Sequence, residues 1–100
     1  MSVVDVDRLV DDLTDVVPGS VRAVLTSVDG LPLATSTGVP AAPAAQLSAI
    51  SAGIAGLAAG AAELLDTARV LQTTIEMTRG VLVLTTLSDG SHLAVLTLRE

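Results

Sequence analysis

The chain has 100 residues, which is enough for one domain and too few for two, so we expect a single domain spanning residues 1–100. Half of the residues are hydrophobic, which disfavours a disordered chain. The net charge of -6 and the absence of lysine argue against binding to nucleic acid or to acidic membranes, because both require a basic surface.

No aromatic residue and no cysteine occur in the chain. The first absence removes the side chains on which bases stack, and the second excludes disulfides and thiol catalysis. The N-terminus carries acids where an export signal would carry Lys or Arg, so we expect a cytoplasmic protein. No charge occurs between Gly30 and Ala62, but prolines interrupt the first part and Ala, Gly and Ser dominate the rest. We therefore expect no membrane insertion.

The first predicted element is a helix over residues 6–17. Its apolar residues recur at the three-and-four spacing of one helical face, and its charged residues lie mainly between them. Pro18 and Gly19 then end the helix.

Two strands are predicted next, over residues 21–28 and 31–36. Asp29-Gly30 between them predicts a two-residue hairpin turn, because both positions tolerate positive φ. Pro32 cannot donate a hydrogen bond to a neighbouring strand, which places the second strand at a sheet edge. Residues 37–43 are expected to form a loop.

A long helix is predicted over residues 44–65. Six apolar side chains alternate in steps of three and four and should lie on the sheet, namely Leu47, Ile50, Ile54, Leu57, Ala61 and Leu64. The other faces carry small residues and no charge before Glu63. Gly inside a helix costs roughly 1 kcal/mol relative to Ala, so Gly53, Gly56 and Gly60 favour close approach of another backbone. The alternative is an Ala-rich helix whose outer face meets water.

Three more strands are predicted, over residues 68–78, 81–87 and 93–98. The first alternates apolar with polar residues and should be half exposed, whereas the others are nearly all apolar, as in central strands. Arg79-Gly80 and residues 88–91 are read as the turns. With the Pro32 strand at one edge and the half-polar strand at the other, the strand order is 2-1-5-4-3.

The predicted fold is therefore α+β, a five-stranded antiparallel sheet with the long helix on one face and the N-terminal helix on the other. Two separate hairpin units are the alternative.

No combination of residues in the chain meets the requirements of catalysis. His92 is the single histidine, and a lone His beside a turn is most often a surface or hydrogen-bonding residue. No Cys or Lys is present as a nucleophile, and no His or Cys has metal-ligand spacing. The helix glycines do not follow a strand, as a dinucleotide-binding motif requires. We therefore expect no enzyme activity, no metal and no cofactor.

Several segments, taken in order, resemble the roadblock family, which includes roadblock-type dynein light chains and bacterial regulators of Ras-like GTPases. These segments are Val16-Val17-Pro18-Gly19, Ala23-Val24-Leu25, Asp29-Gly30-Leu31-Pro32-Leu33, the run from Gln46 to Ala61, Glu76-Met77 before Arg79-Gly80, and Leu93-Ala94-Val95-Leu96 after Asp89-Gly90. The resemblance implies a roadblock-like (profilin-like) sandwich. The family usually ends with a third helix, which we expect to be lacking here because the chain stops at Glu100.

The resemblance further implies a homodimer, in which third strands pair across a two-fold axis and second helices pack side by side. It also implies a small Ras-like GTPase as the partner. On this sequence the docking helix falls on Ala52, Ala55, Gly56, Ala59 and Gly60, and the dimer strand on Leu71, Thr73 and Ile75. Family members that raise GTPase activity insert no arginine, so Arg22, Arg69 and Arg79 are not expected to be catalytic fingers.

Three functions remain open at this point. The first is a dimeric, non-catalytic regulator or adaptor of a Ras-like GTPase. The second is a structural scaffold subunit of a larger complex, with no effect on GTP hydrolysis. The third is a small-ligand sensor that uses the sheet face left without a third helix, which predicts a sizeable apolar pocket.

Overall fold

The computed structural model describes residues 20–66 and 68–98 of the chain. Its elements follow in the order β1 (Ser20–Thr26), β2 (Pro32–Thr35), α2 (Ala41–Glu63), β3 (Gln72–Met77), β4 (Gly80–Thr86) and β5 (His92–Leu98). The helix predicted over residues 6–17 lies outside the described residues.

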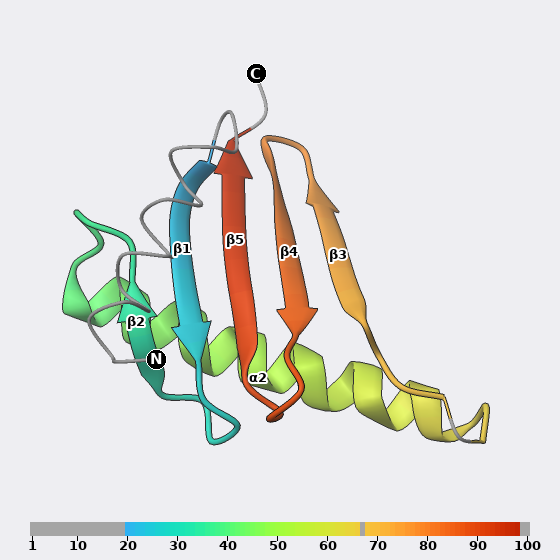
Figure 1. Cartoon of the computed structure of the whole chain (residues 1–100). Helices are drawn as coiled ribbons and strands as arrows, with labels where there is room; N and C mark the ends of the chain where they lie inside the picture. The colour runs from blue at the N-terminus through green and yellow to red at the C-terminus, as the bar shows by residue number, and fades with distance from the viewer. Residues whose placement is uncertain (1–19, 67, 99–100) are drawn as a thin grey trace.

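All five strands form one antiparallel sheet in the order β2-β1-β5-β4-β3, which confirms the predicted topology. Pro32 opens the edge strand β2, as expected of a residue without an N–H donor. Helix α2 crosses one face of the sheet, near the end where the β1–β2 and β4–β5 turns lie (Figure 1). Its C-terminal end extends beyond β3, so only part of the helix has the sheet beneath it.

Each face of the sheet carries an apolar cluster, because successive side chains of a strand point to opposite sides. On the α2 face, Leu82, Leu84 and Ala94 pack with partly buried apolar side chains that include Leu47 and Ile54 of the helix. The cluster on the opposite face consists of Ala23 and Ala34, packed with Leu25, Leu93 and Val95.

The β1–β2 and β4–β5 hairpin turns share one geometry. In the β1–β2 turn, the N–H of Gly30 donates to the Ser27 carbonyl at 3.0 Å. In the β4–β5 turn, the N–H of Gly90 donates to the Leu87 carbonyl at 3.0 Å. Only the glycine of each turn has positive φ, 86° and 90°, so each is a three-residue loop that ends in a glycine bulge. The predicted two-residue Asp29-Gly30 turn is therefore wrong, because Asp29 does not adopt positive φ.

Helix α2 begins three residues earlier than predicted. Pro40 is its N-cap, and the N–H of Ala44 donates to the Pro40 carbonyl at 3.1 Å. Pro43 lies in the first turn, where a missing N–H costs no intrahelical hydrogen bond. The prediction that Pro43 belongs to a loop was therefore wrong, because proline is tolerated in the first turn of a helix.

The apolar stripe predicted to face the sheet is only partly correct. Leu47 and Ile54 pack on the α2-face cluster, but Ile50, Leu57, Ala61 and Leu64 are exposed. The residues that α2 buries are instead small, namely Ala44, Ser48 and Ser51. Before Glu63 the helix carries no charge that would mark its exposed face, and a stripe of large residues and a stripe of small residues share the same spacing. The stripe of small residues faces the sheet, which lets the helix approach it closely.

By length and composition α2 is also long enough to cross a membrane, with a mean hydropathy of 1.4, and 17% of that stretch is buried. The core helix of a water-soluble protein passes the same test, so the absence of membrane insertion stays a prediction.

Candidate interaction surface on α2

The outward face of α2 carries a row of exposed apolar residues. Ile50, Leu57 and Leu64 are 54%, 79% and 86% exposed and follow one another at intervals of seven residues. Gly53 and Gly60 alternate with them in steps of three and four, and a Cβ added at either would meet no atom within 4 Å. We call these five residues the outer ridge. Its spacing is that of a helix-packing seam, with large side chains beside open positions.

The C-terminal half of α2, from Ala52 to Glu63, has no buried residue, and we call it the exposed half. A groove with a volume of about 720 Å³ runs along its other side. One wall consists of Ala52, Ala55, Gly56 and Ala59, and residues 68–71 border it beyond the end of the helix. The β4–β5 turn region forms the other wall, including His92 at the start of β5. We call this feature the α2 groove.

The five predicted docking residues are thus divided between two surfaces. Ala52, Ala55, Gly56 and Ala59 line the α2 groove, whereas Gly60 belongs to the outer ridge. Ala52 also packs against another part of the same chain. A Cβ added at Gly30 would lie 3.2 Å from the Cβ of Ala52. A small residue at position 52 lets the β1–β2 turn approach the helix, so its size does not by itself indicate an external partner.

The predicted dimer strand coincides with the open edge of the sheet. Leu71 lies one residue before β3, and its carbonyl accepts a hydrogen bond from the N–H of Thr86 at 3.2 Å. Hydrogen bonds alternate along an antiparallel pair, so Thr73 and Ile75 also bond toward β4. The backbone groups of Gln72 and Thr74 point the other way, toward the open edge. Side-chain pattern alone did not distinguish these two sets.

Four buried polar side chains lie where α2 packs on the sheet, and one of them, His92, also lines the α2 groove. Thr26 Oγ1 donates to Ser48 Oγ at 3.1 Å, and both side chains are buried. Among the residues that the structure describes, Ser51 Oγ and both ring nitrogens of His92 are buried and have no hydrogen-bond partner. His92 is only 5% exposed, so its interpretation as a surface or hydrogen-bonding residue was wrong. Its position opposite Thr26 and Thr86, under the helix, is a property of the sheet register that no local pattern reveals.

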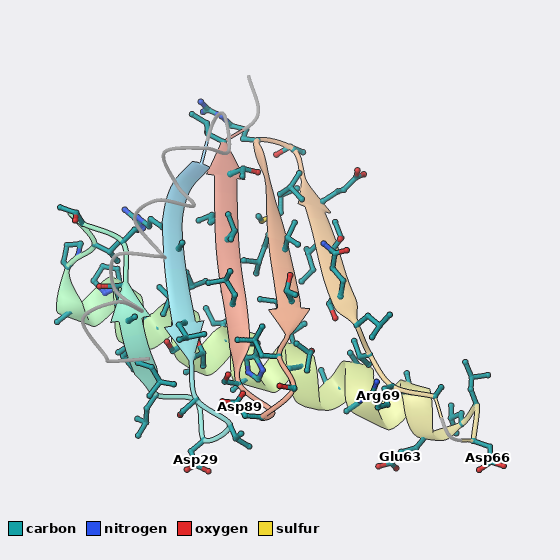
Figure 2. The ribbon with its side chains drawn as sticks, viewed as in Figure 1. Asp29, Glu63, Asp66, Arg69 and Asp89 are labelled. Carbon is teal, nitrogen blue, oxygen red and sulfur yellow. The ribbon has the colours of Figure 1, made fainter. Side chains whose placement is uncertain are left out.

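The charges near the α2 groove are mostly negative. Figure 2 shows Asp29, Asp89, Glu63 and Asp66 along one edge of the molecule, with Arg69 among them. The N–H and hydroxyl of Ser91 both donate to Asp89, and these bonds lower the pKa of that carboxyl below its ordinary value. Asp89 is therefore ionised at neutral pH. Within residues 20–66 and 68–98, no three His, Cys, Asp or Glu side chains gather as a metal site would require.

The C-terminal half of α2 and its surroundings combine an apolar ridge, a groove with small side chains, an open strand edge and several acidic side chains. No base, nucleophile and stabilising donor converge on one point among the side chains that the structure describes.

A family model for the Roadblock/LC7 domain matches residues 6–97 of the chain. No curated protein sequence is significantly similar to it. The crystal structure of a Roadblock/LC7 domain from Streptomyces avermitilis has 33% identity and a TM-score of 0.87, over 94% of this chain and 78% of that one.

Two more distant structures share the fold. MglB of Myxococcus xanthus has 16% identity and a TM-score of 0.87, over 97% of this chain and 72% of that one. An MglB with a tetrameric arrangement has 20% identity and a TM-score of 0.79, over 98% and 74%. The family match over most of the length, together with the strand order and the long helix, shows that this chain belongs to the Roadblock/LC7 domain family.

Proposed function

We propose that the chain is a dimeric, non-catalytic regulator or adaptor of a small Ras-like GTPase, and that it acts by protein–protein contact. The observation that carries the proposal is the exposed half of α2. It presents large apolar side chains and open glycine positions, with no charge before Glu63. A solvated helix face normally carries charged residues, and glycine weakens a helix, so such a surface favours a bound partner.

Two features support a second copy of the chain as one partner. Gln72 and Thr74 turn backbone hydrogen-bonding groups to the open edge of β3, where an antiparallel strand can pair. On the outer ridge, Leu57 lies between Gly53 and Gly60. The large side chains of a facing helix can enter the space that these glycines leave. One MglB structure has a tetrameric arrangement, which supports self-assembly as a property that this fold permits.

The GTPase is placed on the α2 groove and the adjoining part of the helix, the surface that contains Gly56 and Ala59. This assignment follows the resemblance to bacterial regulators in the family. It also fits the small side chains of this wall, because they let the backbone of a partner approach closely.

The docking assignment can be tested with purified Ras-like GTPases of the source organism. Gly56→Arg should keep the fold, because Gly56 is exposed and has no atom within 4 Å of an added Cβ. We expect this variant to bind the GTPase at least about tenfold more weakly, equivalent to about 1.4 kcal/mol. Ala45→Arg is the matched control, exposed on the same helix but outside both surfaces, and should bind like the wild type. Equal binding by Gly56→Arg would show that the docking surface lies elsewhere.

Phosphate release by the GTPase, measured with and without this protein, separates regulation from scaffolding. A change in the hydrolysis rate that Gly56→Arg abolishes supports a regulator. Tight binding with an unchanged rate supports the scaffold.

The dimer is tested by light scattering with refractive-index detection, since the chain has no aromatic residue for absorbance at 280 nm. Thr74→Pro removes an N–H at the open edge and should give monomers, while Thr74→Val keeps that N–H and should give dimers. If Thr74→Pro still forms dimers, pairing of β3 strands is not the dimer contact.

A further inference from the structure

We propose that the α2 groove takes up a short apolar segment of a partner protein flanked by Lys or Arg, with His92 as the polar anchor of the bound segment. The inference rests on the proposed function only in placing a partner on the groove side of α2. It does not require that this partner be a GTPase.

The walls of the α2 groove suit apolar side chains of modest size. Ala52, Ala55 and Ala59 present methyl groups along the helix, and Gly56 widens the groove between them. Leu71 and Leu87 add larger apolar surface on the facing side and are 71% and 40% exposed. A volume of about 720 Å³ is large enough for several side chains of an inserted segment.

His92 lines this groove but does not use its hydrogen-bonding capacity within the described chain. The side chain is more than nine-tenths buried, and neither Nδ1 nor Nε2 has a partner. Ser51 Oγ, also buried beneath α2, lacks a partner as well. Buried polar groups are nearly always satisfied in folded proteins. A polar group on the bound segment, reached by a turn of the imidazole ring, would supply the missing hydrogen bond.

The charge around the groove selects the flanks of the segment. Glu63 lines the groove, and Asp29 and Asp89 directly follow the groove residues Val28 and Ser88. Arg69 is the single Lys or Arg among the groove residues and offsets Glu63, so the net negative charge around the groove comes from the neighbouring Asp29 and Asp89. Complementary charge on a partner steers it to such a surface and fixes its orientation, and a basic flank is what an acidic rim favours.

Binding of a peptide near His92 can be followed directly by proton NMR. Because it has one histidine and no Phe, Trp or Tyr, its aromatic proton NMR signals come from the His92 ring alone. The probe ligand is a capped peptide of sequence Lys-Lys-Leu-Leu-Ala-Leu-Leu-Lys-Lys, and its matched control replaces each Lys by Glu. We expect the Lys-flanked peptide to shift the His92 signals saturably and the Glu-flanked peptide to leave them in place. No shift with either peptide, or equal shifts with both, would overturn the proposal.

Substitutions in the groove locate the binding site. Ala59→Leu adds bulk at an exposed groove position and should weaken binding of the Lys-flanked peptide at least tenfold, measured by fluorescence anisotropy of labelled peptide. Ala45→Leu makes the same change on the same helix outside the groove and should have no effect. Equal affinity of Ala59→Leu and the wild type for the peptide would show that the peptide binds outside the groove.

Two further variants test the anchor and the rim. His92→Leu should weaken binding at least fivefold, and Glu63→Lys roughly threefold to tenfold, with the effect of Glu63→Lys shrinking at high salt. Unchanged affinity in His92→Leu would show that the imidazole does not anchor the peptide. Unchanged affinity in Glu63→Lys would show that the acidic side chains around the groove do not select its basic flanks.

These measurements use no GTPase, so they separate this inference from the proposed function. Peptide binding without GTPase binding would leave the groove inference standing and refute the proposed function. GTPase binding without peptide binding would do the reverse.

Discussion

The two halves of α2 differ in environment far more than in composition. Both halves are rich in alanine and lack charge until Glu63, yet the buried positions Ala44, Ser48 and Ser51 all lie in the first half. No residue of the second half is buried, and Leu57 is 79% exposed. A helix of one composition therefore serves as core at one end and is exposed at the other, where we propose that a partner binds.

The difference arises from how the helix crosses the sheet. Its first half lies over the sheet, where Thr26 of the interior strand β1 donates a hydrogen bond to Ser48 at 3.1 Å. Its second half passes the end of the sheet and extends beyond β3 (Figure 1). Position relative to the sheet, and not residue type, decides which half is covered by the chain itself.

The largest expected effect is at the covered half. Ala44 is 2% exposed, so Ala44→Leu should overpack the core and lower the free energy of unfolding by about 1–3 kcal/mol. Urea unfolding followed by circular dichroism measures the change. Ala45→Leu, one residue further along and exposed, should stay within about 0.5 kcal/mol of the wild type. Similar losses in both variants would mean that the two positions do not differ in burial.

A second expected effect concerns the polar group at the boundary between the halves. His92→Leu removes two buried nitrogens that lack partners, and should raise the free energy of unfolding by about 1 kcal/mol in the isolated protein. The same unfolding experiment measures it. A clear loss of stability would instead indicate that the imidazole is already satisfied in the folded protein.

Substitution of a glycine in the exposed half should have a smaller and favourable effect. Gly56→Ala meets no atom within 4 Å and should stabilise the protein by about 0.5–1 kcal/mol through helix propensity alone. Thermal unfolding at fixed protein concentration checks the gain. The same substitution should weaken partner binding, because it narrows the groove. Stabilisation without any loss of binding would argue that Gly56 is not kept for the partner.

The smallest effect on folding is expected at the outer ridge. Leu57→Gln replaces an exposed side chain and should change the stability of the monomer by less than about 0.5 kcal/mol. Self-association should nevertheless weaken, which dilution monitored by light scattering can detect. An unchanged dimer would show that the ridge takes no part in it.

The topology could be read from the sequence because its signals are local and independent. Pro32 marks one sheet edge, the alternation before Thr78 marks the other, and two Asp-Gly pairs mark hairpins. Each signal acts through the backbone of its own segment, so their combination gave the strand order without any knowledge of packing.

Which residues face which neighbour could not be read in the same way. Gly80 was read as a turn residue, but it begins β4, and a Cβ there would come within 2.5 Å of the Thr97 carbonyl oxygen of β5. Position 80 requires glycine because β5, which begins more than ten residues later in the chain, passes close to its backbone. No local pattern reports such a contact.

The sequence by itself determined the order of strands, the presence of the long apolar helix and the presence of a surface without charge, because spacing, proline and glycine act on the nearby backbone. Only the tertiary structure decided that α2 buries its small residues and exposes Leu57 and Leu64. It alone brought His92 beneath the helix, where neither ring nitrogen has a hydrogen-bond partner in the described part of the chain. Those outcomes depend on the angle and depth at which a helix meets a sheet, which contacts distant in sequence set.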